Sequence, residues 1–223
     1  MAFKTCVTLA ESSPAKLNAL LKTTLKRSDY IEIRFDFMEP NKIPIALNLV
    51  KKYLNRCICT LRPRLDKGKF SGSEKNRISI LKLIAEYNPY LLDVEYNTIR
   101  KNSALHQYLK KTKTDLLISW HDFAKTPNIS YLKTTRKKMA KFSKNVKIVT
   151  TARSIKDTLS ILSLYKSRND TNLIAFAMGD YGRMSRILCT QLGSPYTYVS
   201  LGKPVAPGQF SLDEIKSIFE LKQ

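Results

Sequence analysis

Two residues in apolar surroundings carry the chemistry that this sequence suggests. The stretch NVKIVTTARS, residues 145–154, places Lys147 inside a run that otherwise has the pattern of a buried β-strand. Burial disfavours the charged form of an amine, so a lysine in such a wall is a nucleophile that can attack a ketone and form an imine. His121 closes a second apolar run, DLLISWHD, and an imidazole is a suitable base for a proton on the carbon next to an imine. The pair predicts Schiff-base chemistry with proton abstraction.

The elements that must position these residues repeat along the whole chain. Apolar runs with the character of strands occur at residues 5–10, 30–36, 56–62, 90–96, 115–122, 146–152, 172–179 and 196–201. Helical patterns separate them, for example SPAKLNALLKTTLK with a Ser cap and a Pro in its first turn. No linker, sequence repeat or low-complexity tract interrupts the 223 residues. The pattern predicts one α/β domain over residues 1–223, a (β/α)8 TIM barrel, although counting alone also permits a doubly wound sheet.

Polar residues gather late in these predicted strands, where a barrel of this kind carries its chemistry. They are Glu32, Arg34, Asp36, Arg62, Asp93, Glu95 and His121, with Arg186 following the seventh strand. Strand alternation places Glu32, Arg34 and Asp36 on one face, and charged side chains inside a barrel must either pair or act. For Glu32 and Arg34 alone, a structural ion pair is as good an interpretation as a functional one.

Composition narrows the class of protein. The formal net charge is +21, from 39 Lys and Arg against 18 Asp and Glu, but the lysines are scattered over predicted helices without a nucleic-acid motif. We therefore expect no nucleic-acid partner, and a field that attracts a small acidic metabolite. No run approaches the ~18–20 apolar residues that span a bilayer, and the N-terminus lacks a secretory signal pattern, which predicts a cytoplasmic protein without membrane association.

Six motifs follow one another between residues 32 and 210. They are EIRFD, TLR followed by DKGKFSG, SWHDF, VKI before TTA, MGDYGRMSRI and APGQF. In this order they resemble the motifs of the type I 3-dehydroquinate dehydratases of the shikimate pathway, and the resemblance runs from about residue 5 to residue 220. The resemblance implies a (β/α)8 barrel, usually a homodimer, that removes water from 3-dehydroquinate to give 3-dehydroshikimate without a metal or an organic cofactor.

The resemblance also implies a role for each site residue. Lys147 is the Schiff-base lysine that attacks the C3 ketone, and His121 is the base that takes the C2 proton and later the acid for the departing C1 hydroxyl. Arg186 binds the substrate carboxylate, a role for which a guanidinium fork is suited. The other implied substrate contacts are Glu32, Arg34 and Arg62 to hydroxyls, and Gln209 on a mobile loop, residues 202–210, that closes over the substrate.

Two positions depart from the family's usual pattern. Asp66 stands where a glutamate commonly orients the catalytic histidine, so a carboxylate one methylene shorter would have to orient His121. Val205 stands just before APGQ, where many members carry a hydroxyl. Loss of one neutral hydrogen bond there costs about 0.5–1.5 kcal/mol of binding, which predicts a raised Michaelis constant.

Two rival functions follow from the same residues. A class I Schiff-base aldolase acting on a sugar phosphate would also use a buried lysine, and it would need a phosphate site after strands seven and eight. MGDYG and LGKPVAPG are the glycine-bearing segments in those places. A barrel without activity that binds a polyanion or a protein is the second rival. The ordered motifs and the carboxylate-binding arginine favour the dehydratase.

Overall fold

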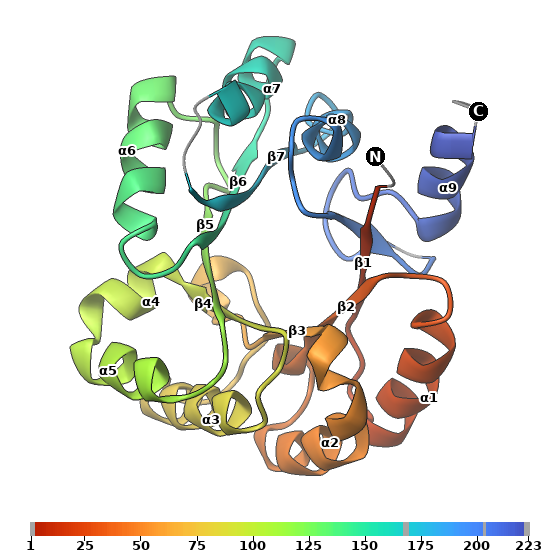
Figure 1. Cartoon of the computed structure of the whole chain (residues 1–223), viewed down its shortest axis with the longest axis vertical. Coiled ribbons are helices and arrows are strands. Elements are labelled where there is room, and N and C mark those ends of the chain that lie inside the picture. The colour runs from red at the N-terminus through yellow and green to blue at the C-terminus, as the bar shows by residue number, and fades with distance from the viewer. Residues whose placement is uncertain (1–2, 167–169, 203, 221–223) are drawn as a thin grey trace. The chain divides into compact units, whose positions relative to one another are not determined.

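In this computed structural model, eight strands alternate with helices along the described residues. Figure 1 shows the elements in chain order by colour. The structure describes residues 3–166, 170–202 and 204–220. The strands are β1 Thr5–Leu9, β2 Tyr30–Arg34, β3 Cys57–Thr60, β4 Leu91–Glu95, β5 Leu116–His121, β6 Asn145–Thr151, β7 Asn172–Met178 and β8 Thr197–Ser200. Each lies within or one residue beyond a predicted run, so all eight predicted strands are confirmed.

The helices follow the strands in turn. They are α1 Pro14–Thr24, α2 Ile43–Val50, α3 Glu74–Glu86, α4 Tyr96–Lys101, α5 Ser103–Lys111, α6 Ile129–Met139, α7 Ile155–Leu162, α8 Ser185–Gln191 and α9 Leu212–Glu220. Short 3-10 helices are η1 Phe35–Phe37, η2 Pro40–Lys42, η3 Lys51–Arg56, η4 Arg64–Asp66 and η5 Ser163–Lys166. Ser13 caps α1, because its hydroxyl accepts a hydrogen bond from the backbone of Lys16 as the sequence predicts.

The strands form one sheet whose order follows the chain, β7-β6-β5-β4-β3-β2-β1-β8. Neighbours such as β2 and β3, β3 and β4, and β6 and β7 pair in parallel. Parallel strands joined in sequence order through helices are the arrangement of a (β/α)8 barrel. Among the described residues, no helix is long and apolar enough to cross a membrane.

Contacts within the chain group into two compact units. The N-terminal unit is Thr8–Leu117, and the C-terminal unit joins the described parts of residues 1–7 and 118–223. Buried aliphatic side chains from strands and helices form the core of each, for example Ile33 and Leu81 in the first and Ile148 and Ile161 in the second. Each unit carries a share of the predicted site residues.

Candidate active site

Lys147 lies in the middle of β6 and is buried, with 5% of its surface exposed. It is opposite Ile174 in the register between β6 and β7. Its Nζ atom lies 4.2 Å from the ring centroid of Tyr198 on β8, where the face of the ring attracts a cation. The predicted burial of this lysine is therefore confirmed, and an aromatic ring forms part of its surroundings.

The guanidinium of Arg186, in the same C-terminal unit, lies over the ring of Phe176. The rings of Tyr198 and Phe176 are tilted neighbours, with centroids 6.3 Å apart. The Cζ atom of Arg186 lies 4.4 Å above the ring of Phe176 on β7. The side chains of Lys147 and Arg186 thus lie over two aromatic rings that contact each other. Reasoning from the sequence missed this aromatic pair, since only the alternation of β7 and β8 could have indicated which ring faces which side.

Arg186 is a buried guanidinium at the start of α8, with 2% of its surface exposed. Its Nη2 atom donates to the carbonyl of Pro207 over 3.1 Å, and no carboxylate of the described residues pairs with it. Burial lowers the pKa of Arg186 to about 10, which the neighbouring Cys189 only partly offsets. A desolvated cation without a counter-ion among the described residues is a favourable place for an anionic ligand.

The turn at residues 205–209 carries Gln209, which is also buried. Its Oε1 atom accepts a hydrogen bond from the backbone N–H of Val205 over 2.9 Å, so the side chain closes the turn. Gly208 has a φ of +72°, and a Cβ there would lie 3.0 Å from the carbonyl oxygen of Gly179. Only glycine suits that conformation at so close an approach. Val205, which departs from the family's usual pattern, therefore lies in a tightly packed turn. The same turn contains the carbonyl of Pro207, which accepts the hydrogen bond from Arg186.

His121 ends β5 and is partly exposed, and its ring stacks on Phe123 with centroids 5.5 Å apart. The next residue, Asp122, donates its backbone N–H to the carbonyl of Val149 over 2.9 Å. Its own carbonyl accepts from the hydroxyl of Thr151 over 3.1 Å. These bonds join the carboxyl end of β5 to β6, so the histidine and Lys147 belong to neighbouring strands of the sheet.

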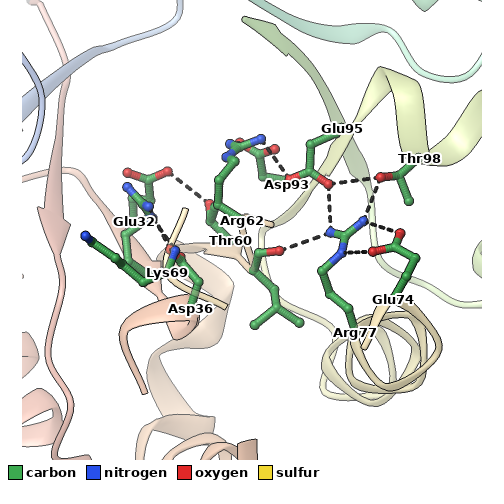
Figure 2. A network of polar contacts seen from close by, with 12 residues as sticks. Glu32, Asp36, Thr60, Arg62, Lys69, Glu74, Arg77, Asp93, Glu95 and Thr98 are labelled. Carbon is green, nitrogen blue, oxygen red and sulfur yellow. Dashed lines mark hydrogen bonds and ion pairs between the residues drawn. The ribbon is translucent and has the colours of Figure 1, made fainter. Parts of the chain in front are cut away.

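Glu32 and Arg62, two predicted residues of the N-terminal unit, take part in the polar contacts that Figure 2 shows from close by. Glu32 on β2 is buried, and its two carboxylate oxygens accept hydrogen bonds from Thr8 and Thr60, each over 2.9 Å. These hydroxyls compensate part of the cost of burying the carboxylate. Glu32 is thus held from the strands on both sides of it.

Arg34 pairs with Asp36 rather than standing beside it on a strand face. The strand ends at Arg34, and Asp36 lies in η1, so the prediction that Asp36 continues the alternation is wrong. Two hydrogen bonds of 2.8 Å join the guanidinium to the carboxylate, which also accepts from the backbone of Lys69 over 2.9 Å. Burial lowers the pKa of Arg34, and Asp36 and Glu32 together more than offset this. Among the described residues, no acceptor binds Nη1 of Arg34.

Arg62 follows β3 and bonds to two buried carboxylates of β4. Its Nη2 atom donates to Asp93 over 2.7 Å and its Nη1 atom to Glu95 over 2.9 Å. Burial lowers the pKa of Arg62, and these two carboxylates together with that of Glu32 more than offset this effect. Gly68 packs against the backbone of Arg62, since a Cβ there would lie 2.0 Å from the Arg62 carbonyl oxygen. The loop must therefore return over Arg62 at this glycine.

Asp66 ends η4 and is partly exposed. Burial raises its pKa, against the opposing effect of Arg62 and Arg77. The pairing of Asp66 with His121 stays a prediction, because the two residues belong to different units. Within the described residues, no group of three or more His, Cys, Asp or Glu is arranged to hold a metal ion.

Comparison with known proteins identifies related chains. Residues 5–223 match the model of a family described as type I 3-dehydroquinase. A 3-dehydroquinate dehydratase from Dehalococcoides mccartyi is 37% identical over 202 residues, which cover 88% of this chain and 88% of that protein. Another from Methanococcus maripaludis is 32% identical over 220 residues, covering 97% and 98%.

A solved structure shows the same fold. The crystal structure of the 3-dehydroquinate dehydratase from Geobacillus kaustophilus matches with a TM-score of 0.88 over 99% of this chain and 91% of that one, at 19% identity. Together with the strand order, this likeness confirms the predicted (β/α)8 barrel.

Proposed function

The chain belongs to the type I 3-dehydroquinase family, so it is a dehydratase of the hydro-lyase class, and we propose that it acts on 3-dehydroquinate through an imine on Lys147. The observation that carries this proposal is the arrangement on the aromatic pair. The buried amine of Lys147 lies over one ring, and the buried guanidinium of Arg186, which pairs with no carboxylate of the described residues, lies over the contacting ring. A substrate with both a ketone and a carboxylate suits a nucleophilic amine beside a guanidinium.

The proposed reaction uses the amine of Lys147 as nucleophile. It adds to the C3 ketone, water leaves, and the imine acidifies the C2 position. His121 takes the C2 proton and then protonates the departing C1 hydroxyl, which leaves as water. Hydrolysis of the imine consumes one water and returns the amine, so the net loss is one water. Arg186 binds the carboxylate of the substrate throughout.

The remaining contacts follow the family resemblance. We assign Glu32, Arg34 and Arg62 to the hydroxyls of the substrate, and Gln209 to the loop that covers it. Nη1 of Arg34, without an acceptor among the described residues, supports its part in this assignment. Asp66 has the proposed role of orienting the imidazole of His121.

Trapping the imine tests the proposal. Incubation of the chain with 3-dehydroquinate and sodium borohydride is expected to give a reduced adduct that mass spectrometry maps to Lys147. Without borohydride, the conjugated enone product is expected to accumulate and absorb in the ultraviolet. A folded chain that forms neither adduct nor enone would contradict the proposal, and cleavage of a carbon–carbon bond in a sugar phosphate would favour the aldolase instead. The family match gives that alternative no support.

We further propose a homodimer, formed through one face of the C-terminal unit. Helices α7 and α8 pack against each other, and both lie in that unit (Figure 1). Exposed apolar side chains recur there at helical spacing: Ile155 and Leu159 on α7, and Met184, Leu188 and Leu192 on and beside α8. An apolar face of this kind is typical of a subunit interface.

Two charges on this face are expected to separate the subunits. The double variant Leu159→Glu/Leu188→Glu places like charges in the proposed interface, and we expect light scattering after size exclusion to show a monomer. Ile45→Glu is the matched control, because Ile45 is an exposed apolar residue of α2 in the other unit. A double variant that keeps the mass of the unaltered chain would exclude this face.

Two further expectations remain proposals. The four cysteines, Cys6, Cys57, Cys59 and Cys189, are free and buried, which suits the reducing cytoplasm in which we place the protein. The single catalytic domain over residues 1–223 also stays a prediction.

A further inference from the structure

Arg77 lies in the first turn of α3 with 1% of its surface exposed. Its guanidinium donates five hydrogen bonds (Figure 2). Nε and Nη2 donate to the two carboxylate oxygens of Glu74, each over 2.8 Å, and Nη2 also donates to the hydroxyl of Thr98 over 2.6 Å. Nη1 donates to Oε2 of Glu95 over 2.8 Å and to the carbonyl of Leu61 over 3.1 Å. A guanidinium has five N–H donors, so these bonds occupy the whole group. Any effect of Arg77 on a ligand must therefore pass through its partners.

Two of these partners lead to Arg62. The carbonyl of Leu61 belongs to the residue just before Arg62 in the chain. Glu95 is shared, because its Oε1 atom accepts from Arg62 over 2.9 Å while its Oε2 atom accepts from Arg77 (Figure 2). Arg77 thus holds both the backbone that leads into Arg62 and a carboxylate that binds the guanidinium of Arg62.

The charges of this cluster depend on Arg77. Burial raises the pKa of Glu95, while Arg62 and Arg77 oppose the rise. Without Arg77, the buried carboxylate would face one guanidinium fewer, and its neutral form would be favoured further. A neutral Glu95 would lose the charge-assisted part of its bond to Arg62. The side chain of Glu74 is 56% exposed, so water screens most of the effect of its charge on the cluster.

We propose that Arg77 is a positioning residue for the reaction: through Glu95 and Leu61 it holds Arg62 in the orientation in which Arg62 binds a substrate hydroxyl. This inference rests on the proposed function, in which Arg62 contacts the substrate. Orientation matters because a hydrogen bond weakens steeply as its donor leaves the line to the acceptor. A loosened guanidinium would bind ground state and transition state less well by the same amount.

Steady-state kinetics with 3-dehydroquinate test this role. We expect Arg77→Gln to raise KM about tenfold, as for a weakened hydrogen bond to a charged group, and to leave kcat within about twofold. A double-mutant cycle shows whether Arg77 affects KM through Arg62 or independently of it. If Arg77 acts through Arg62, Arg62→Gln/Arg77→Gln has the KM of Arg62→Gln alone. Arg77→Lys, which keeps the charge but not the fork, is expected to give an intermediate KM and serves if Arg77→Gln does not fold.

Arg56→Gln is the matched control. Arg56 also joins separate segments, through the carbonyls of Leu25, Ser28 and Asp29, so its loss should lower the melting temperature without changing KM. An unchanged KM in the Arg77 variants, or additive effects in the cycle, overturns the positioning role while Arg62→Gln still raises KM. No turnover by the unaltered chain, or an unchanged KM in Arg62→Gln, overturns the proposed function and this inference with it.

Discussion

Replacing Lys147 by methionine is expected to lower kcat by a factor on the order of 10⁴ or more, the scale seen when a covalent nucleophile is removed. The methionine side chain is apolar and nearly as long as that of lysine, so the buried position on β6 remains filled. The variant cannot form an imine. We therefore expect borohydride treatment with 3-dehydroquinate to leave its mass unchanged, and circular dichroism to show the fold of the unaltered chain.

Lys144→Met is the matched control for this variant. Lys144 lies three residues earlier and is exposed, so it has the same chemistry without the burial. We expect it to keep kcat and to form the adduct. Substantial turnover by Lys147→Met, or an adduct on another lysine, would show that the amine of Lys147 is not the nucleophile.

Arg186→Met is expected to raise KM about 100-fold, because the variant removes the guanidinium that binds the substrate carboxylate. The same change is expected to raise the melting temperature. In the unaltered chain this cation is desolvated, its pKa is lowered to about 10 by burial, and no carboxylate of the described residues pairs with it. Burial of such a charge costs free energy that an apolar side chain does not. Methionine also keeps a favourable contact with the ring of Phe176.

Arg136→Met controls for the loss of a buried arginine. The guanidinium of Arg136 donates to the hydroxyl of Thr171 and to the carbonyl of Leu164, so its bonds are structural. We expect this variant to lower the melting temperature and to leave KM unchanged. The carboxylate role of Arg186 would be wrong if its own variant bound 3-dehydroquinate as well as the unaltered chain does.

The local sequence pattern was sufficient to locate the strands. A short apolar run is a property of six to eight neighbouring positions, and such runs located all eight strands, including the one that buries Lys147. The strand ends were less accurate. The run at residues 30–36 continues to be apolar at Phe35, yet the backbone turns into η1 there, so Asp36 meets Arg34 from a 3-10 helix.

Tertiary structure alone decided which side chains meet. Nothing near Arg77 in the sequence distinguishes it from the other basic residues of the helices, and its contact with Glu95 depends on how the first turn of α3 packs beside β4. The contact between Phe176 and Tyr198, on different strands, is likewise invisible in either run. The physical reason is one of range: the period of a strand is set by neighbouring residues, whereas the partner of a guanidinium or a ring is set by the register and packing of elements far apart in the chain.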